Sequence, residues 1–145
     1  MALEKARYYA DRAEFELLNG NWVVAIAESE SGLKILKTAE IAPQFKEQIN
    51  TLNLLLNGFR TTANDAQLNE AAEAKFNALK LEVQGSMWSA DKRSLAIISG
   101  EAYFVQDKIG DENDAVTIVN IDPNRVDFMI NHQRKRFEFK RYIDN

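Results

Sequence analysis

The sequence predicts an α+β fold: an N-terminal antiparallel α-helical segment followed by a small antiparallel β-sandwich or partly open barrel. Residue usage changes near position 90, because Ala, Leu, Glu, Gln and Asn are frequent in 1–90 whereas Val, Ile, Phe, Tyr and Asp dominate 94–143. Apolar residues recur at helical spacing in the first part and alternate with a period near two in the second. We therefore expect two domains, an α-helical domain at 1–88 and a small antiparallel β-domain at 91–145.

Four helices are expected in the first part. The segments with apolar residues at helical spacing are 3–18, 22–37, 43 to about 57 or 60, and 66–83.

The expected helix boundaries rest on residues that favour turns and caps. Asn19-Gly20-Asn21 separates the first two helices, and Pro43 suits the first turn of the third. The segment 61–65 is expected to be a turn whose last residue, Asp65, caps the fourth helix. Gly85 is expected to stop that helix and to open the junction between the two domains.

Five strands are expected in the second part, with no helix between them. They are 95–98, 102–105, 116–121, 125–130 and 134–142. The segments 99–101, 122–124 and 131–133 are turns of hairpin length. Short strands joined by such turns predict an antiparallel sheet or a small sandwich.

Composition excludes several classes of function. The chain has 145 residues, a net charge of −4 and no cysteine, so thiolate metal sites and cysteine nucleophiles are excluded and general nucleic-acid binding is disfavoured. No segment approaches the roughly 18 consecutive apolar residues of a membrane span. Residues 1–10 carry charges and do not form a signal peptide. We expect either a cytoplasmic protein or a soluble part of a longer, anchored chain.

Few residues are suited to catalysis or metal binding. The single histidine, His132, falls in an expected turn without an oriented partner. An acidic loop at 107–114 has the wrong register for a calcium site, because Gly110 precedes Asp111, Glu112 and Asp114 and no bidentate Glu closes the loop at the expected distance. An enzyme would have to use pairs such as Asp107 and Asp111, and phosphate-loop, GxSxG and HExxH motifs are absent. We expect no catalytic residues, no metal and no cofactor.

The candidate binding residues are basic or aromatic. Arg134, Arg136 and Lys140 alternate with Phe137 and Phe139 in the last expected strand. Such interleaving occurs in nucleic-acid platforms. Strand alternation favours a simpler interpretation, in which the phenylalanines face inward and the basic residues face water and protect an edge, with an anionic or protein-binding patch as the alternative.

The two tryptophans, Trp22 and Trp88, are the expected anchors for a partner protein. Trp22 has an alternative role as a packing residue in the turn between the first two helices.

Residues 13–33 resemble the helix–turn–helix core of a tetratricopeptide repeat. The family has a small residue at the turn, an aromatic residue after it and an alanine that lets the helices approach. These three positions are occupied here by Gly20, Trp22 and Ala25. The resemblance implies a concave groove within 1–85 that binds a peptide or a helix. A generic helical hairpin needs small turn residues for the same reason.

Residues 94–109 and 116–128 resemble the periplasmic homology-region domain of type II secretion inner-membrane proteins of the GspC and GspB type, and of the related PilP-type pilus-assembly lipoproteins. Gln106-Asp107-Lys108-Ile109 stands where the family has a Gly-Asp-x-Ile step, with the glycine replaced. Ile121 and Val126 keep the family's I-x-x-x-x-V spacing. The resemblance implies a β-sandwich that docks on the periplasmic domain of an outer-membrane secretin.

The expected function is a non-enzymatic protein–protein interaction module, a periplasmic component of a type II secretion or pilus-like assembly. Its partners are other proteins, such as a secretin, and not nucleic acid. The alternative is a cytoplasmic adaptor that binds a peptide or helix in the groove of 1–85.

Overall fold

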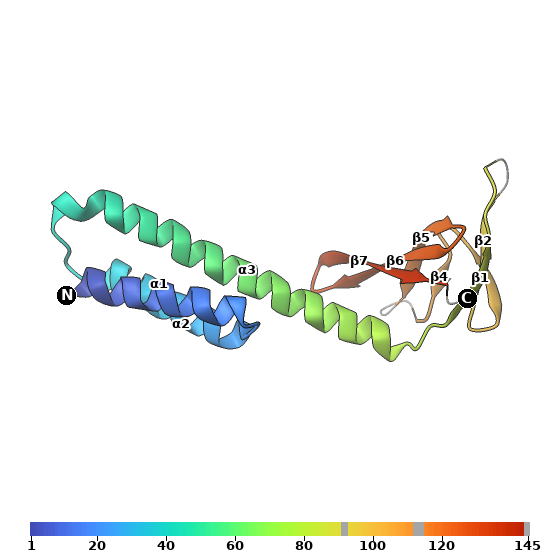
Figure 1. Ribbon diagram of the computed structural model, residues 1–145, viewed down its shortest axis with the longest axis horizontal. Helices are drawn as coiled ribbons and strands as arrows, with labels where there is room; N and C mark the ends of the chain where they lie inside the picture. Colours follow the sequence, from blue (N-terminus) through green and yellow to red (C-terminus); the bar gives the residue numbers. More distant parts are fainter. Residues whose placement is uncertain (91–92, 112–114, 144–145) are drawn as a thin grey trace. The chain divides into compact units, whose positions relative to one another are not determined.

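The structure is a computed structural model that describes residues 1–90, 93–111 and 115–143. Its helices are α1 (Ala2–Leu18), α2 (Trp22–Thr38), the short 3-10 helix η1 (Pro43–Phe45) and α3 (Lys46–Ala78). Two antiparallel sheets follow them along the chain (Figure 1). The predicted α+β class, with its N-terminal helical part, is confirmed.

One long helix replaces the third and fourth predicted helices. α3 runs for 33 residues, without a turn at 61–65 and without a helix start at Asp65. That segment contains neither Gly nor Pro, and its Thr, Asn and Asp residues each cost only about 0.7 kcal/mol in a helix. Ala63 is fully buried, so the helix continues to bury one side through the expected turn.

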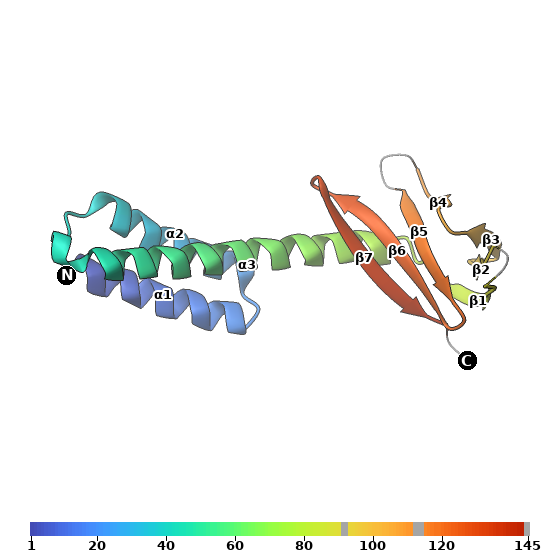
Figure 2. The same ribbon diagram turned by 90° about the horizontal axis from the view of Figure 1, so that it is seen from above.

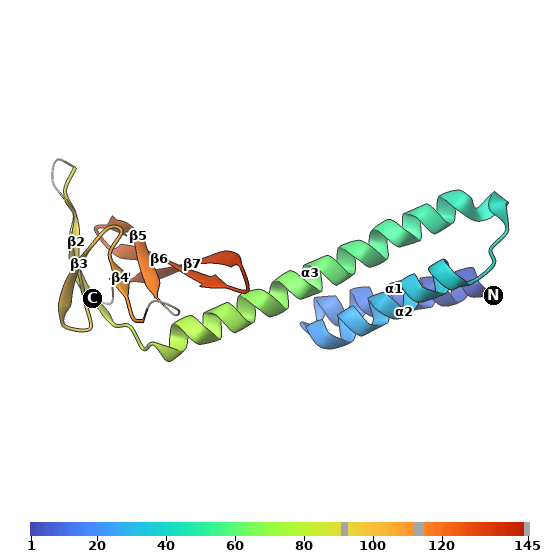
Figure 3. The ribbon, with the colours of Figure 1, turned by 180° about the vertical axis from the view of Figure 1, so that it is seen from behind.

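The chain divides into two compact units, 1–67 and 68–145, and the boundary between them falls within α3. In the first unit, α1 and α2 form an antiparallel hairpin beside the first part of α3 (Figure 3). The core residues of this unit are Leu3, Ala6, Ala10, Leu36, Leu52 and Leu56.

The α1–α2 hairpin turns at the residues that carry the tetratricopeptide-like pattern. Gly20 has φ +75°, a left-handed conformation that glycine adopts without strain. Its ideal Cβ position lies 3.8 Å from the Trp22 ring. Ala25 is completely buried one turn later. The hairpin therefore turns at a small residue and buries the small side chain of Ala25.

In its described ranges, the second unit has seven strands in two sheets. One sheet has the order β1-β2-β3, from β1 (Val83–Met87), β2 (Leu95–Ile98) and β3 (Glu101–Phe104). The other has the order β4-β5-β6-β7, from β4 (Lys108–Ile109), β5 (Val116–Asp122), β6 (Arg125–His132) and β7 (Lys135–Tyr142) (Figure 2). All neighbours within each sheet are antiparallel.

All five predicted strands are present, but β1 and β4 were not predicted. The predicted helix end at 83 is wrong, because α3 ends at Ala78 and Lys80 turns the chain with φ +50°. Gly85 is not a helix stop: it lies in β1 opposite Ile97. The sequence of β1 is a weak strand signal. Backbone hydrogen bonds to the neighbouring strand β2 therefore decide its conformation.

The core of the second unit joins both sheets to the end of α3. Its buried residues are Ala72, Phe76, Ala96, Ile98, Val116, Ile118, Ile121, Val126, Phe128, Ile130 and Phe139. The Phe76 ring lies 5.2 Å from the Phe128 ring and 5.1 Å from the Phe139 ring, centre to centre. The Arg141 guanidinium covers Phe76 at 4.7 Å and donates to Asn77 Oδ1 (2.8 Å). The last turns of α3 are thus part of the β-rich unit.

Candidate functional site

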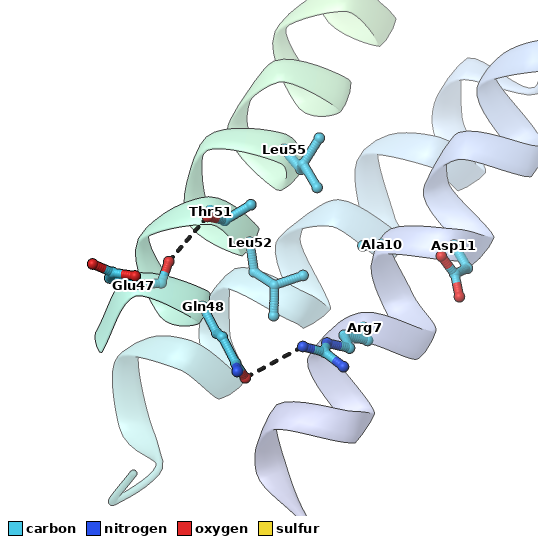
Figure 4. A pocket seen from close by; sticks show the side chains of 8 residues that line it. All are labelled: Arg7, Ala10, Asp11, Glu47, Gln48, Thr51, Leu52 and Leu55. Carbon is cyan, nitrogen blue, oxygen red and sulfur yellow. Dashed lines mark hydrogen bonds between the residues drawn. The ribbon is translucent and has the colours of Figure 1, made fainter. Parts of the chain in front are cut away.

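The helical unit contains an open groove between α1 and α3, of about 440 Å³ (Figure 4). Its lining residues are Arg7, Ala10, Asp11, Glu47, Gln48, Thr51, Leu52 and Leu55. Arg7 Nη2 donates to Gln48 Oε1 (3.3 Å) and so links the two helices across the groove.

The groove combines apolar and charged surface. Ala10 and Leu52 are buried in the core of the unit, whereas Leu55 is 45% exposed. Arg7, Asp11 and Glu47 are exposed and bring both signs of charge to the groove. An apolar strip between charged side chains suits one face of an amphipathic helix or peptide.

Trp22 is the first residue of α2 and lies outside this groove, at the α1–α2 turn. It is half-buried, and its buried indole N–H has no hydrogen-bond acceptor among the described residues. The surrounding turn exposes Leu18 (79%) and Val23 (66%). The ring therefore packs in the turn, as the alternative interpretation expects, beside an exposed apolar end of the hairpin.

Trp88 follows β1 in the second unit. Its side chain is 53% exposed, and that of the preceding Met87 is 69% exposed. Large apolar side chains at this exposure are available to a partner.

The three predicted basic residues lie at two kinds of position. Arg134 is in the two-residue turn between β6 and β7, where Gln133 has φ +48° and Arg134 has φ +65°. Arg136 and Lys140 are exposed on β7, whereas Phe139 is buried. The predicted alternation along this strand is confirmed, so the structure brings Arg136 and Lys140 to one face and places Arg134 at the strand's start.

That face of the sheet has a shallow hollow of about 450 Å³ lined by Val119, Met129, Arg136 and Glu138. Arg136 Nε lies 2.9 Å from Met129 Sδ and donates to it. Among the described residues, this hollow contains a cation and a carboxylate but no pair arranged as nucleophile and base.

Sequence reasoning missed a charged cluster at the β5–β6 turn. Arg125 pairs with Asp122 (Nη2 to Oδ2, 2.7 Å) and with Asp127 (Nε to Oδ1, 2.9 Å), and Asn120 donates to Asp122 Oδ2 (3.0 Å). A hydrogen bond with Tyr142 and the charges of Asp127 and Asp122 raise the pKa of Arg125, although desolvation opposes them. Strong turn residues at 122–124 were the available signal, because they bring Asp122 close to Arg125.

The remaining candidates for catalysis or metal binding are His132 and the acidic residues of 107–114. His132 ends β6 opposite Lys135, one residue earlier than the turn itself. Asp107 Oδ2 accepts a hydrogen bond from the Phe104 backbone N–H (2.7 Å) and so closes the turn after β3. Asp111 is exposed, whereas Glu112 and Asp114 of the acidic loop lie outside the described residues. Within the described part of the chain, no three His, Asp or Glu side chains gather as metal ligands would.

Comparison with protein-family models, with curated proteins and with solved structures finds no match to this chain. In the ranges that the structure describes, no helix is both long and apolar enough to span a membrane.

Proposed function

We propose that this chain is a non-enzymatic protein–protein interaction module, a periplasmic component of a type II secretion or pilus-like assembly. One observation carries the proposal: the residues with the secretion-type pattern form consecutive strands around one core. Residues 94–109 contain β2, β3 and β4, and 116–128 contain β5 and the first half of β6. In this proposal the β-rich unit is the docking unit, and the partner is a secretin or another protein of the assembly.

The same unit offers surfaces that suit a protein partner. Met87 and Trp88 provide exposed apolar anchors, and Arg136 and Lys140 provide exposed charge on the other sheet. Anchors of this kind dominate binding energy in protein interfaces, while charges guide the encounter.

The test is capture of partners from a bacterial envelope extract with the full chain as bait. The full chain is required because a bait starting at 91 lacks β1 and Phe76, which belong to the fold of this unit. Recovery of a secretin or another secretion component, reduced for the Trp88→Ala variant, supports the proposal. Recovery of cytosolic proteins alone contradicts it.

A second candidate function is a cytoplasmic adaptor that binds a peptide or helix in the groove between α1 and α3. The observation that favours it is the half-exposed Leu55 beside Leu52 and Ala10, between charged side chains. Burying such apolar surface contributes about 25 cal/mol per Å² to binding, before the entropic costs of association.

Two adjacent leucines give this candidate a matched test. Leu55 lines the groove, whereas Leu54 is 76% exposed and does not line it. Leu55→Glu places a carboxylate in the apolar strip and is expected to abolish capture of a cytosolic partner. Leu54→Glu changes the charge equally and is expected to preserve capture, and equal loss in both variants would contradict the groove as the binding site.

A further inference from the structure

We propose that the free edge of β7 is a strand-addition site for an extended, acidic segment of a partner protein. This inference rests on the proposed function, because it makes the β-rich unit the docking unit and names the chemistry of its partner.

The backbone of β7 has one paired edge and one free edge. β7 is the last strand of its sheet, and its eight residues pair with β6 without a register shift. Just beyond the strand, the Ile143 N–H donates to the Asn124 carbonyl (2.9 Å). Backbone groups on an antiparallel strand alternate between its two sides. Residues 135, 137, 139 and 141 therefore face β6, like Ile143.

The same alternation directs the N–H and C=O groups of Arg136, Glu138 and Lys140 toward the free edge. In the described ranges, no strand pairs with β7 on that side, although the Lys140 carbonyl accepts a hydrogen bond from Arg141 Nη1 (3.0 Å). The other outward N–H and C=O groups are a template for a further strand, and strand addition is a recurring mode of peptide recognition.

The charge of this edge selects the partner. Residues 134–142 carry five basic side chains and one carboxylate, although the whole chain has a net charge of −4. Asp127, which lies opposite Lys140 on β6, is already paired with Arg125. Two copies of β7 would place like charges beside each other, which disfavours self-association through this edge. An acidic strand is complementary to it.

The core-facing side of the edge also has apolar surface left to cover. Phe139 is buried under Phe76, whereas Phe137, two residues earlier, is only half-buried. A strand beside β7 would place alternate side chains near Phe137 and the others near Arg136 and Lys140. The expected ligand alternates apolar and acidic residues.

The experiment follows backbone amide hydrogen exchange in the full chain. The probe is a peptide of alternating glutamate and valine, matched to β7 in length, and the control peptide has lysine in place of glutamate. The first peptide is expected to slow exchange at Arg136, Glu138 and Lys140. The amides of Phe137 and Phe139, which already face β6, are expected to change little. The lysine peptide is expected to protect none of them.

Variants separate strand addition from attraction between charges. Glu138→Pro removes one outward N–H at an edge position that tolerates proline, and is expected to abolish binding, whereas Glu138→Gln retains it. Arg136→Glu combined with Lys140→Glu is expected to weaken binding about tenfold or more. Lys108→Glu, an exposed position on β4 at the opposite end of the sheet order, is the control and is expected to have an effect below about twofold.

Absence of protection at the three outward amides, or equal binding of the lysine peptide, would overturn the inference. So would binding of a single-stranded oligonucleotide in place of the acidic peptide, because β7 would then be a nucleic-acid platform. If a secretion component is captured while the outward amides stay unprotected, only the strand-addition inference fails. If those amides are protected and no secretion component is captured, the proposed function fails and the edge site remains.

Discussion

At the residue scale, Gly32 in α2 lies close to side chains of both α1 and α3. A Cβ at this position in α2 would lie 2.9 Å from both Leu56 methyl groups and 3.2 Å from Tyr9 Cβ. Leu56 is fully buried, so its methyl groups would have to shift within the core to make room. We expect Gly32→Ala to lower the free energy of unfolding of this unit by about 1–3 kcal/mol, measured by urea denaturation.

The control for this prediction is a second helical glycine. Among the described residues, and apart from its chain neighbours and its own helix backbone, Gly58 in α3 has no atom within 4 Å of its ideal Cβ position. Gly58→Ala is expected to raise the free energy of unfolding by up to about 1 kcal/mol, because alanine is the better helix former. Stabilisation by both substitutions would contradict the close packing at Gly32.

Asp127 tests whether the charged cluster at the β5–β6 turn is structural. Its side chain is only 9% exposed, and its Oδ1 lies 2.9 Å from Arg125 Nε. Asp127→Ala removes one of the two carboxylates that pair with the Arg125 guanidinium. We therefore expect the free energy of unfolding to fall by about 1–3 kcal/mol, measured by urea denaturation. Glu138→Ala, at an exposed position on the same sheet, is the control and is expected to stay within about 0.5 kcal/mol.

Tyr103 tests the effect of one surface hydrogen bond on titration. Its hydroxyl donates to Glu101 Oε2 (2.8 Å), and this hydrogen bond is the largest of the effects that raise the pKa of Tyr103. Partial desolvation and the charges of Glu101 and Asp107 raise it further. Glu101→Gln removes the negative acceptor, so Tyr103 is expected to ionise at lower pH than in the parent chain. Ultraviolet titration of tyrosinate measures the difference, and an unchanged curve would contradict the bond in solution.

Some residue positions could be predicted from the sequence and others could not. The alternation from Arg136 to Lys140 was predictable, because a strand with one buried face dictates it. The burial of Asp127 was not, because a carboxylate is buried only where a cation compensates it, and Arg125 meets it through the turn geometry. The position of Trp22 was open, since the same residue type serves both packing and binding.

At the element scale, the strands were more predictable than the end of the long helix. The β2–β3 turn contains Gly100 and the β5–β6 turn contains Pro123 and Asn124, so these strand ends carry a sequence signal. The end of α3 after Ala78 carries no Gly or Pro. β1 contains Gly85 and few β-branched residues, so its conformation depends on pairing with β2. The sequence predicted a groove only as a general property of a helical hairpin. Its lining residues could not be predicted, because they come from α1 and from a part of α3 that is far away in sequence.

The dependence of the second unit on α3 leads to a prediction at this scale. Phe76 stacks between Phe128 and Phe139, so Phe76→Ala is expected to cost about 3–5 kcal/mol. For the same reason, a fragment of 91–145 is expected not to fold, whereas a fragment of 68–145 retains Phe76 and β1. Dispersion of amide resonances distinguishes the two, and a folded 91–145 fragment would show that α3 is dispensable for the sheets.

At the scale of the whole molecule, two cores are carried by one chain and share no residue. One core consists of residues from Leu3 to Leu56, and the other of residues from Ala72 to Phe139. α3 contributes Leu52 and Leu56 to the first and Ala72 and Phe76 to the second. Substitutions far apart without shared partners have additive effects, so damage to one core does not remove contacts within the other.

We therefore expect reciprocal effects on the unfolding of the two units. Gly32→Ala should lower the urea midpoint of resonances from the first unit and leave those from β5 to β7 unchanged, whereas Phe76→Ala should do the opposite. α3 could couple the unfolding of the two units, because helix formation is cooperative along the chain. Unfolding of one end of α3 therefore destabilises the helical turns next to it. If the two variants lower both midpoints equally, the helix couples the cores into one cooperative transition. Separate shifts would show that packing within each core outweighs the continuity of the helix.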